Sequence, residues 1–132
     1  MEWIIQAENI TKSFGSVQVL QCLDLQVTKG ELIAIMGKSG SGKSTLLHIL
    51  GTLDKADSGM LKIAGKNPNE FNQDRLAEFR NKEIGFVFQF HHLLPEFNLL
   101  ENISMPGYIA GNKNEVLQSR AAFLLDYFGL KN

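Results

Sequence analysis

The sequence predicts an α/β protein in which a core of parallel strands carries an antiparallel β layer on one side and helices on the other. Three observations support this prediction. Residues 3–27 mix β-branched and aromatic residues with polar ones, and within 17–27 apolar and polar residues alternate, as they do in half-exposed strands. The stretch ELIAIM at 31–36 is almost entirely apolar, as in a strand covered on both faces. A polar, glycine-rich loop follows it and leads directly into an apolar helical segment.

The composition bounds the class of protein. The 132 residues correspond to about one domain, and a formal net charge of −1 argues against a nucleic-acid partner. The single cysteine, Cys22, cannot form an internal disulfide and is expected to be a small buried residue. The N-terminus does not have the pattern of a signal peptide, and no apolar run approaches the roughly 20 residues of a membrane helix.

The antiparallel layer is expected in residues 1–30 and 58–66. Two strands extend from Trp3 to Val27, because β-branched and aromatic residues alternate there with polar ones, and Phe14-Gly15-Ser16 supplies the turn. The stretch DSGMLKIAGK, flanked by turn residues, predicts a short third strand that returns to this layer.

The core is expected in residues 31–57 and 67–90. After the strand at 31–36, the helix that begins at Lys43 is predicted to pack residues 46–50 inward. A polar helix follows, with Leu76 and Phe79 on one side, and IGFVF at 84–88 predicts a second buried strand.

The remaining residues, 91–132, are predicted to form a loop and the start of a helical subdomain. Asn98 with Glu101 three residues later is a capping-box pattern, which predicts a helix start, and residues 112–115 repeat the pattern. The last helix has an apolar stripe and is expected to end at Gly129.

The loop GKSGSGKST at 37–45 matches the phosphate-binding pattern G-x-x-x-x-G-K-[ST]. Glycines let successive backbone N–H groups turn toward phosphate oxygens, and the following helix N-terminus favours negative charge. Lys43 is expected to reach the β- and γ-phosphates, and the Ser44 hydroxyl to ligate Mg²⁺. The expected ATP-binding residues of the loop are Gly37, Lys38, Ser39, Gly40, Ser41, Gly42, Lys43, Ser44 and Thr45.

The context of the loop, between a predicted buried strand and a helix, favours a P-loop NTPase (RecA-like) core over a flexible glycine-serine turn. The glycines at 37, 40 and 42 do not give the spacing of a dinucleotide-binding loop.

With this loop placed, essentially the whole chain resembles the nucleotide-binding domain of ABC transporters. In ENITKSFG the resemblance implies that Phe14 stacks on adenine, with Val19 near the ribose; without it, Phe14 would be read as a core or turn residue. The strand IGFVFQ resembles the one that leads into the family's Q-loop. The resemblance therefore implies that Gln89, together with Lys43, is catalytic and that Gln89 ligates Mg²⁺ near the attacking water.

The stretch FQFHHLLPEFNLLENISMP closely resembles the ATP-binding subunits of lipoprotein-releasing systems, which act at the inner membrane of Gram-negative bacteria. The resemblance implies a peripheral protein on the cytoplasmic face of that membrane, whose loop receives a cytoplasmic helix of a membrane subunit. The implied contact residues are His91, His92, Leu93, Leu94, Pro95 and Phe97. Taken as bare residues, the two histidines are read as surface imidazoles instead.

Three catalytic elements of the family are absent from the sequence: the LSGGQ-type signature, the Walker B aspartate with its glutamate, and the switch histidine. Asp126 follows an apolar run but lies in a helical pattern, and Tyr127 rather than glutamate comes next. The chain is therefore expected to be the N-terminal part of one ATP-binding domain. The full-length homodimer is expected to hydrolyse ATP, and these 132 residues alone are expected not to.

Other functions stay open at this point. Related ATP-binding subunits serve macrolide export or cell-division complexes, and soluble ABC proteins act in translation or DNA repair. A second phosphate loop downstream would favour the soluble class. A non-catalytic nucleotide-sensing module is a third class, against which a downstream catalytic glutamate would argue.

Overall fold

The computed structural model describes residues 2–90 and 92–130. The chain divides into two compact units, residues 1–85 and 86–132, and each is described by itself. None of the described helices is long and apolar enough to cross a membrane.

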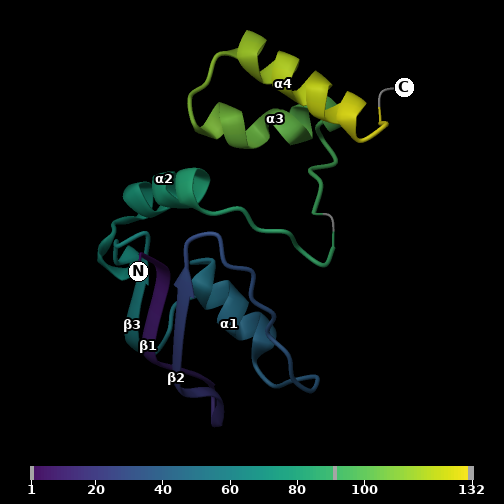
Figure 1. The fold of residues 1–132 in the computed structure, drawn as a ribbon. Coiled ribbons are helices and arrows are strands. Elements are labelled where there is room, and N and C mark those ends of the chain that lie inside the picture. The colour runs from purple at the N-terminus through teal and green to yellow at the C-terminus, as the bar shows by residue number, and fades with distance from the viewer. Residues whose placement is uncertain (1, 91, 131–132) are drawn as a thin grey trace. The chain divides into compact units, whose positions relative to one another are not determined.

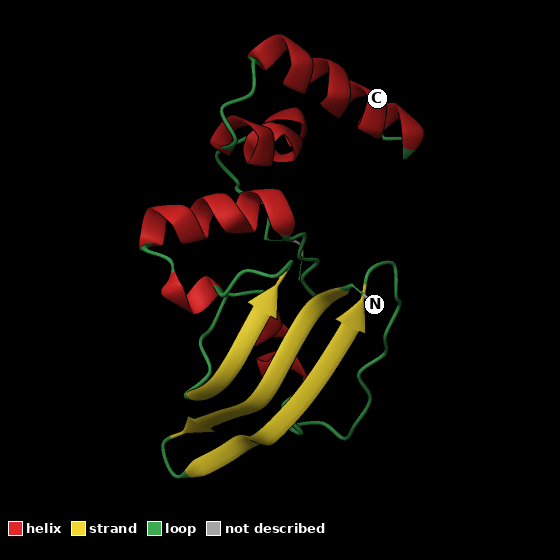
Figure 2. Cartoon of the chain, turned by 60° about the vertical axis from the view of Figure 1, so that its left-hand side comes forward, coloured by secondary structure: helices red, strands yellow, loops and turns green. Residues whose placement is uncertain are grey.

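An antiparallel sheet of three strands forms the frame of the first unit (Figures 1 and 2). β1 (Trp3–Phe14) lies between β2 (Val17–Thr28) and β3 (Ser58–Ile63) and pairs with both. Gly15, at φ +59°, makes the turn from β1 to β2. The predicted antiparallel layer is therefore confirmed.

Helix α1 (Lys43–Leu50) contributes Leu46, Ile49 and Leu50 to the core. Their i, i+3, i+4 spacing places them on one side of the helix, where they join apolar residues of the sheet. Leu47 and His48 are exposed, so the prediction that all five residues 46–50 pack inward was wrong. A helix of 3.6 residues per turn cannot bury five consecutive side chains against a single layer.

Two short helical elements follow the sheet: the 3₁₀ helix η1 (Pro68–Glu70) and helix α2 (Gln73–Glu83). Asn72 is the N-cap of α2, and its side chain accepts a hydrogen bond from the backbone N–H of Arg75. Phe79 on α2 is buried in the core, as predicted.

Arg80 connects α2 to Thr52, the second residue after the C-terminal end of α1. Its Nε donates to both the carbonyl oxygen and the hydroxyl oxygen of Thr52 at 3.1 Å, and Nη2 donates to the same carbonyl. Thr52 is buried and has φ +58°, an unfavourable conformation for a β-branched residue. The guanidinium therefore satisfies a buried backbone group that water does not reach.

We expect Arg80→Met to lower the free energy of unfolding by about 1–3 kcal/mol, because the buried Thr52 carbonyl loses a charged donor. Lys82→Met on the same helix is the matched control, since the i, i+4 ion pair of Lys82 with Glu78 is exposed. That control is expected to cost about 0.5 kcal/mol or less. Urea unfolding of the full-length gene product measures both, and equal losses for the two variants would contradict this role of Arg80.

Neither predicted buried strand is a strand in the structure, so these two predictions were wrong. Residues 31–36 and 84–88 are irregular and pair with none of the three described strands. Leu32 and Val87 are each 96% exposed. A parallel strand needs a hydrogen-bonded neighbour and cover on both faces, and within residues 2–90 and 92–130 these segments have neither.

The exposed apolar segment 31–36 predicts that the 132-residue chain self-associates at micromolar concentration. Apolar stretches that can form strands and have no partner are open to pairing between copies. Light scattering is expected to show species larger than one chain, with a hydrophobic dye bound at the same concentrations. A compact monomer across this range would overturn the prediction.

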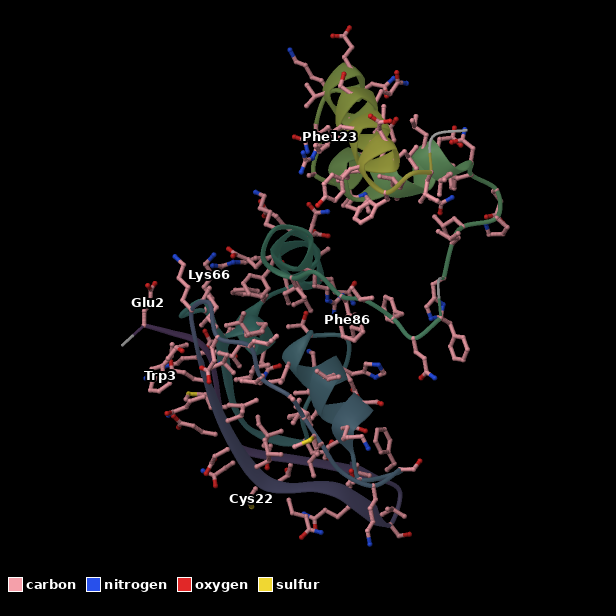
Figure 3. The ribbon with its side chains drawn as sticks, turned by 45° about the vertical axis from the view of Figure 1, so that its right-hand side comes forward. Glu2, Trp3, Cys22, Lys66, Phe86 and Phe123 are labelled. Atoms are coloured by element: carbon pink, nitrogen blue, oxygen red, sulfur yellow. The ribbon has the colours of Figure 1, made fainter. Side chains whose placement is uncertain are left out.

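Cys22 is exposed rather than buried, so the sequence expectation for it was wrong. Its φ of +46° and the register shift between the Ile10 and Lys12 pairings place it in an irregularity of β2. Figure 3 shows its side chain at the outer surface of the sheet. The prediction came from the general tendency of free cysteines to be buried, which a local bulge in a strand can override.

The second unit contains α3 (Leu99–Ile109) and α4 (Asn114–Tyr127), which pack on each other. The predicted capping box is present: Asn98 accepts from the N–H of Glu101, whose carboxylate accepts from the N–H of Asn98. The second predicted box is wrong, because α4 begins after Lys113 rather than Asn112. Gly129, at φ +68°, follows the helix end as predicted.

Candidate nucleotide-binding site

The phosphate loop takes a shape that depends on its glycines. Gly40 and Gly42 have φ of +76° and +86°, a region that other residues rarely adopt. At Gly37 an added Cβ would lie 2.6 Å from the Ser41 hydroxyl oxygen, so the loop closes on itself there. The sequence pattern predicted this need for glycine at 37, 40 and 42.

β2 supports the end of the loop. Gly42 is buried, and a Cβ there would lie 2.9 Å from Val19 Cγ1 and 3.1 Å from the Val19 carbonyl oxygen. Val19 is therefore in contact with the last residue before α1. This contact fixes the place of the helix N-terminus against the sheet.

The N-terminus of α1 suits an anion. The first intrahelical bond is from Leu46 to the Gly42 carbonyl, which leaves the N–H groups of residues 43–45 free of helical partners. Gly42 caps the helix without a side-chain hydrogen bond from any described residue, and the first turn has no acidic residue. The helix dipole adds partial positive charge at this point.

The Lys43 side chain folds back over the loop. Its Nζ donates to the carbonyl oxygens of Gly37, at 2.9 Å, and Lys38, at 2.6 Å. The ammonium is thus held over the loop, close in sequence to the N–H groups of residues 43–45 at the start of α1. The Lys43 ammonium, the N–H groups at the start of α1 and the glycines at 37, 40 and 42 together fit a phosphate chain.

The Ser44 hydroxyl is a group of the kind that can ligate a phosphate-bound Mg²⁺. Ser44 is exposed at the second position of α1, next to Lys43. The described residues contain no group of three His, Cys, Asp or Glu side chains that could hold a metal ion.

Phe14 lies at the end of β1, directly before the turn to β2, and is 52% exposed. One of its neighbours was missed from the sequence: the Lys12 ammonium lies 5.3 Å from the centre of its ring. Phe14 and Val19 therefore both belong to the β1–β2 hairpin, whose second strand contacts the loop at Gly42.

The remaining predicted site residues belong to the second unit. Gln89 is exposed at a bend after the irregular segment 84–88. His92 has its ring edge-on to Phe88, with the ring centres 4.9 Å apart. His91 lies outside the described residues. Leu93, Leu94 and Phe97 are between 42% and 54% exposed, and Pro95 is exposed beside them.

Asn102 holds this loop in shape, and the sequence alone did not single it out. Its side-chain oxygen accepts from the N–H of Leu94, and its amide donates to the carbonyl oxygens of Leu94, Phe97 and Asn98. Four bonds from one amide fix a loop that would otherwise leave several backbone groups unpaired. We name residues 93–97 the apolar loop.

Comparison with models of protein families shows the family to which the chain belongs. The ABC transporter family model matches residues 20–132, a span that begins in β2 and includes the phosphate loop. The chain belongs to the ABC transporter family. The phosphate-loop pattern at 37–45 and the β1–β2 hairpin before it are consistent with this membership.

Several curated ABC proteins are similar along nearly the whole chain. The lipoprotein-releasing system ATP-binding protein LolD of Bacteroides fragilis is 54% identical over 97% of the chain and 59% of its own length. The proteins of the same name from Porphyromonas gingivalis and Shewanella oneidensis are each 50% identical, over 98% and 96% of the chain. The chain spans somewhat less than 60% of the length of these three relatives.

Solved ABC cassettes have the same fold. A dimeric bacterial ABC transporter cassette superposes with a TM-score of 0.85 at 36% identity, over 92% of this chain and 56% of that one. A dimeric post-hydrolysis cassette bound to ADP and Pi gives 0.83, again at 36% identity. The predicted fold class, an α/β ABC ATPase domain with an antiparallel β layer and the start of a helical subdomain, is thereby confirmed.

Proposed function

We propose that the full-length gene product is the ATP-binding subunit of an ABC transporter that couples ATP hydrolysis to the release of lipoproteins from the inner membrane. The single observation behind the ATP part is the phosphate loop, where Lys43 and the uncapped N-terminus of α1 meet. The similarity to LolD proteins supports the lipoprotein part.

In this proposal the residues of the loop bind Mg-ATP. The loop N–H groups and Lys43 hold the β- and γ-phosphates, Ser44 ligates Mg²⁺, and Phe14 stacks on adenine with Val19 near the ribose. Bound Mg²⁺ neutralises the charge that develops on the phosphates during hydrolysis. Gln89 contributes an amide oxygen that orients water or joins the metal ligands.

Two copies act together in the proposal, because the solved cassettes that resemble this chain are dimers. ATP is bound between copies, and closure moves the membrane subunits. The 132-residue chain by itself is proposed to be inactive, since it lacks the family's signature, Walker B carboxylates and switch histidine. We place the protein at the cytoplasmic face of the inner membrane, as a peripheral subunit.

The apolar loop is the proposed contact with the membrane subunits, together with His91 and His92. Leu93, Leu94 and Phe97 are exposed on a backbone that Asn102 holds in shape, which is an arrangement suited to receiving an apolar helix. Exposed apolar side chains on an ordered loop are costly to keep in water unless a partner covers them.

Leu94→Asp is expected to weaken co-purification with the membrane subunits at least about tenfold, because a carboxylate would enter an apolar contact. Ile109→Asp, at the exposed end of α3, is the control and is expected to leave co-purification unchanged.

Depletion of the gene is expected to retain lipoproteins in the inner-membrane fraction. If lipoproteins reach the outer membrane normally after depletion, the cargo part of the proposal fails.

A further inference from the structure

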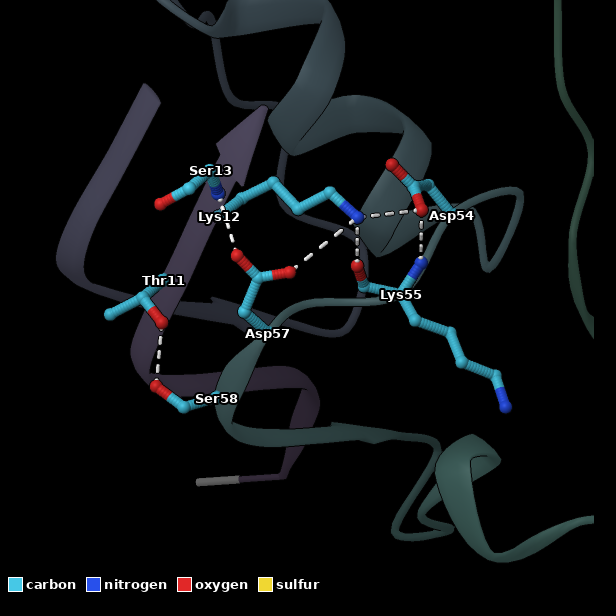
Figure 4. A network of polar contacts seen from close by, with 7 residues as sticks. All are labelled: Thr11, Lys12, Ser13, Asp54, Lys55, Asp57 and Ser58. Carbon is cyan, nitrogen blue, oxygen red and sulfur yellow. Dashed lines mark hydrogen bonds and ion pairs between the residues drawn. The ribbon is translucent and has the colours of Figure 1, made fainter. Parts of the chain in front are cut away.

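Lys12 is a nearly buried lysine that none of the proposed functions uses. Its side chain is 12% exposed, and its ammonium donates to Asp54 Oδ1 at 2.9 Å and to the Lys55 carbonyl oxygen at 2.6 Å (Figure 4). The nearer carboxylate oxygen of Asp57 lies 3.9 Å away. A charge that is largely removed from water is thus matched by two carboxylates and a carbonyl.

The same ammonium lies against the Phe14 ring. The distance from Nζ to the ring centre is 5.3 Å, within the range of a cation–π contact. Asp54 and the Lys55 carbonyl fix the position of this cation, so the ring has a fixed neighbour on one side. Phe14 is nevertheless 52% exposed, which leaves ring surface open to a ligand.

The polar network formed by Lys12 with Asp54, Lys55 and Asp57 also reaches α1, the helix that follows the phosphate loop. The backbone N–H of Asp54 donates to the His48 carbonyl of α1 at 3.2 Å. A second set of bonds fastens the strand: Asp57 Oδ2 accepts from the N–H of Ser13 at 2.7 Å, and the Thr11 and Ser58 hydroxyls lie 2.6 Å apart (Figure 4). Lys12 therefore connects the end of β1 with the far end of α1.

The charges of the network favour its ionised form. The hydrogen bond from Lys12, followed by that from the Lys55 N–H, lowers the pKa of the Asp54 carboxyl below its ordinary value. Asp54 thus keeps its negative charge at neutral pH beside the Lys12 side chain.

We propose that Lys12 is a positioning residue for the base of ATP: it holds the Phe14 ring at a fixed place relative to the phosphate loop. This inference rests on the proposed adenine stacking by Phe14. A ring that is already oriented loses little freedom when a base stacks on it, and so gives tighter binding. The phosphates themselves are bound elsewhere, by the loop and α1.

The test separates the base from the phosphates. The full-length gene product with Mg²⁺ is titrated with ATP and, separately, with inorganic tripolyphosphate, which has no base. Lys12→Met is expected to weaken ATP binding about three- to tenfold, from the lost cation–π contact and the freed ring. Tripolyphosphate affinity is expected to change less than about twofold, which also shows that the variant is folded.

Three further variants complete the design. Lys12→Arg keeps a cation with donors and is expected to restore ATP affinity to within about twofold of the wild type. Asp54→Asn keeps the shape and removes the anchoring charge, and is expected to give an intermediate loss. Phe14→Ala is expected to weaken ATP about tenfold and to leave tripolyphosphate binding unchanged.

Two results would overturn the inference while the stacking proposal stands. One is equal weakening of ATP and tripolyphosphate by Lys12→Met, which would make Lys12 a general structural residue. The other is unchanged ATP affinity in Lys12→Met when Phe14→Ala still weakens it. If Phe14→Ala itself leaves ATP affinity unchanged, the proposed stacking fails, and the role of Lys12 fails with it.

Discussion

Lys43→Ala is expected to lower the ATPase rate of the full-length gene product by about 100- to 1,000-fold, which is typical for loss of one group that stabilises transition-state charge. The ammonium lies over the phosphate loop, where it donates to the Gly37 and Lys38 carbonyl oxygens. In the proposed function this ammonium is the positive charge beside the γ-phosphate, and alanine has no charge to replace it. The loss is therefore expected in the rate as well as in nucleotide affinity.

Lys29→Ala is the matched control for this experiment. Lys29 is an exposed lysine of the same unit, in the turn after β2, and its removal changes the net charge equally. Release of inorganic phosphate at saturating ATP measures both variants. A Lys43→Ala protein that retains more than about a tenth of the wild-type rate would show that another group supplies the charge.

Gly59→Ala is expected to lower the free energy of unfolding by about 2–6 kcal/mol. Gly59 lies in β3 with φ +101°, and a Cβ there would lie 2.5 Å from the Asn9 carbonyl oxygen and 2.6 Å from that of Glu8. Both are backbone atoms of β1 and cannot move aside. Backbone strain of roughly 1–3 kcal/mol and overpacking of a similar size add to this range.

Gly65→Ala separates strain from overpacking. Gly65 also has positive φ, at +72°, but an added Cβ would meet no described atom within 4 Å. This variant is expected to cost only about 1–2 kcal/mol, the price of the left-handed conformation for an alanine. Urea unfolding gives both values. Equal losses at the two positions would contradict the close approach of β1 to Gly59 in the β1–β3 pairing.

The features that the sequence predicted well depend on neighbours along the chain. The turn at Gly15, the capping box of Asn98 and Glu101, and the need for glycine at 37, 40 and 42 each follow from a few consecutive residues. The β1–β2 pairing also belongs here, because a short turn joins two alternating segments.

What the sequence predicted poorly depends on residues far apart. An apolar run such as 31–36 indicates burial but does not say what would cover it, and in the structure Leu32 is exposed. Lys12 and Asp54 are 42 positions apart, and Arg80 and Thr52 are 28 apart, so only the fold brings each pair together. The exposure of Cys22 follows from a bulge that no local pattern indicates.

The central claim is that the loop at 37–45 binds the phosphates of Mg-ATP. The most direct measurement is calorimetric titration of the full-length gene product with Mg-ATP, first alone and then in the presence of tripolyphosphate. We predict saturable binding of one nucleotide per chain, competed by tripolyphosphate and lost in Gly42→Val, where a side chain would strike Val19 and strain the loop. Unchanged Mg-ATP affinity in Gly42→Val would contradict the claim.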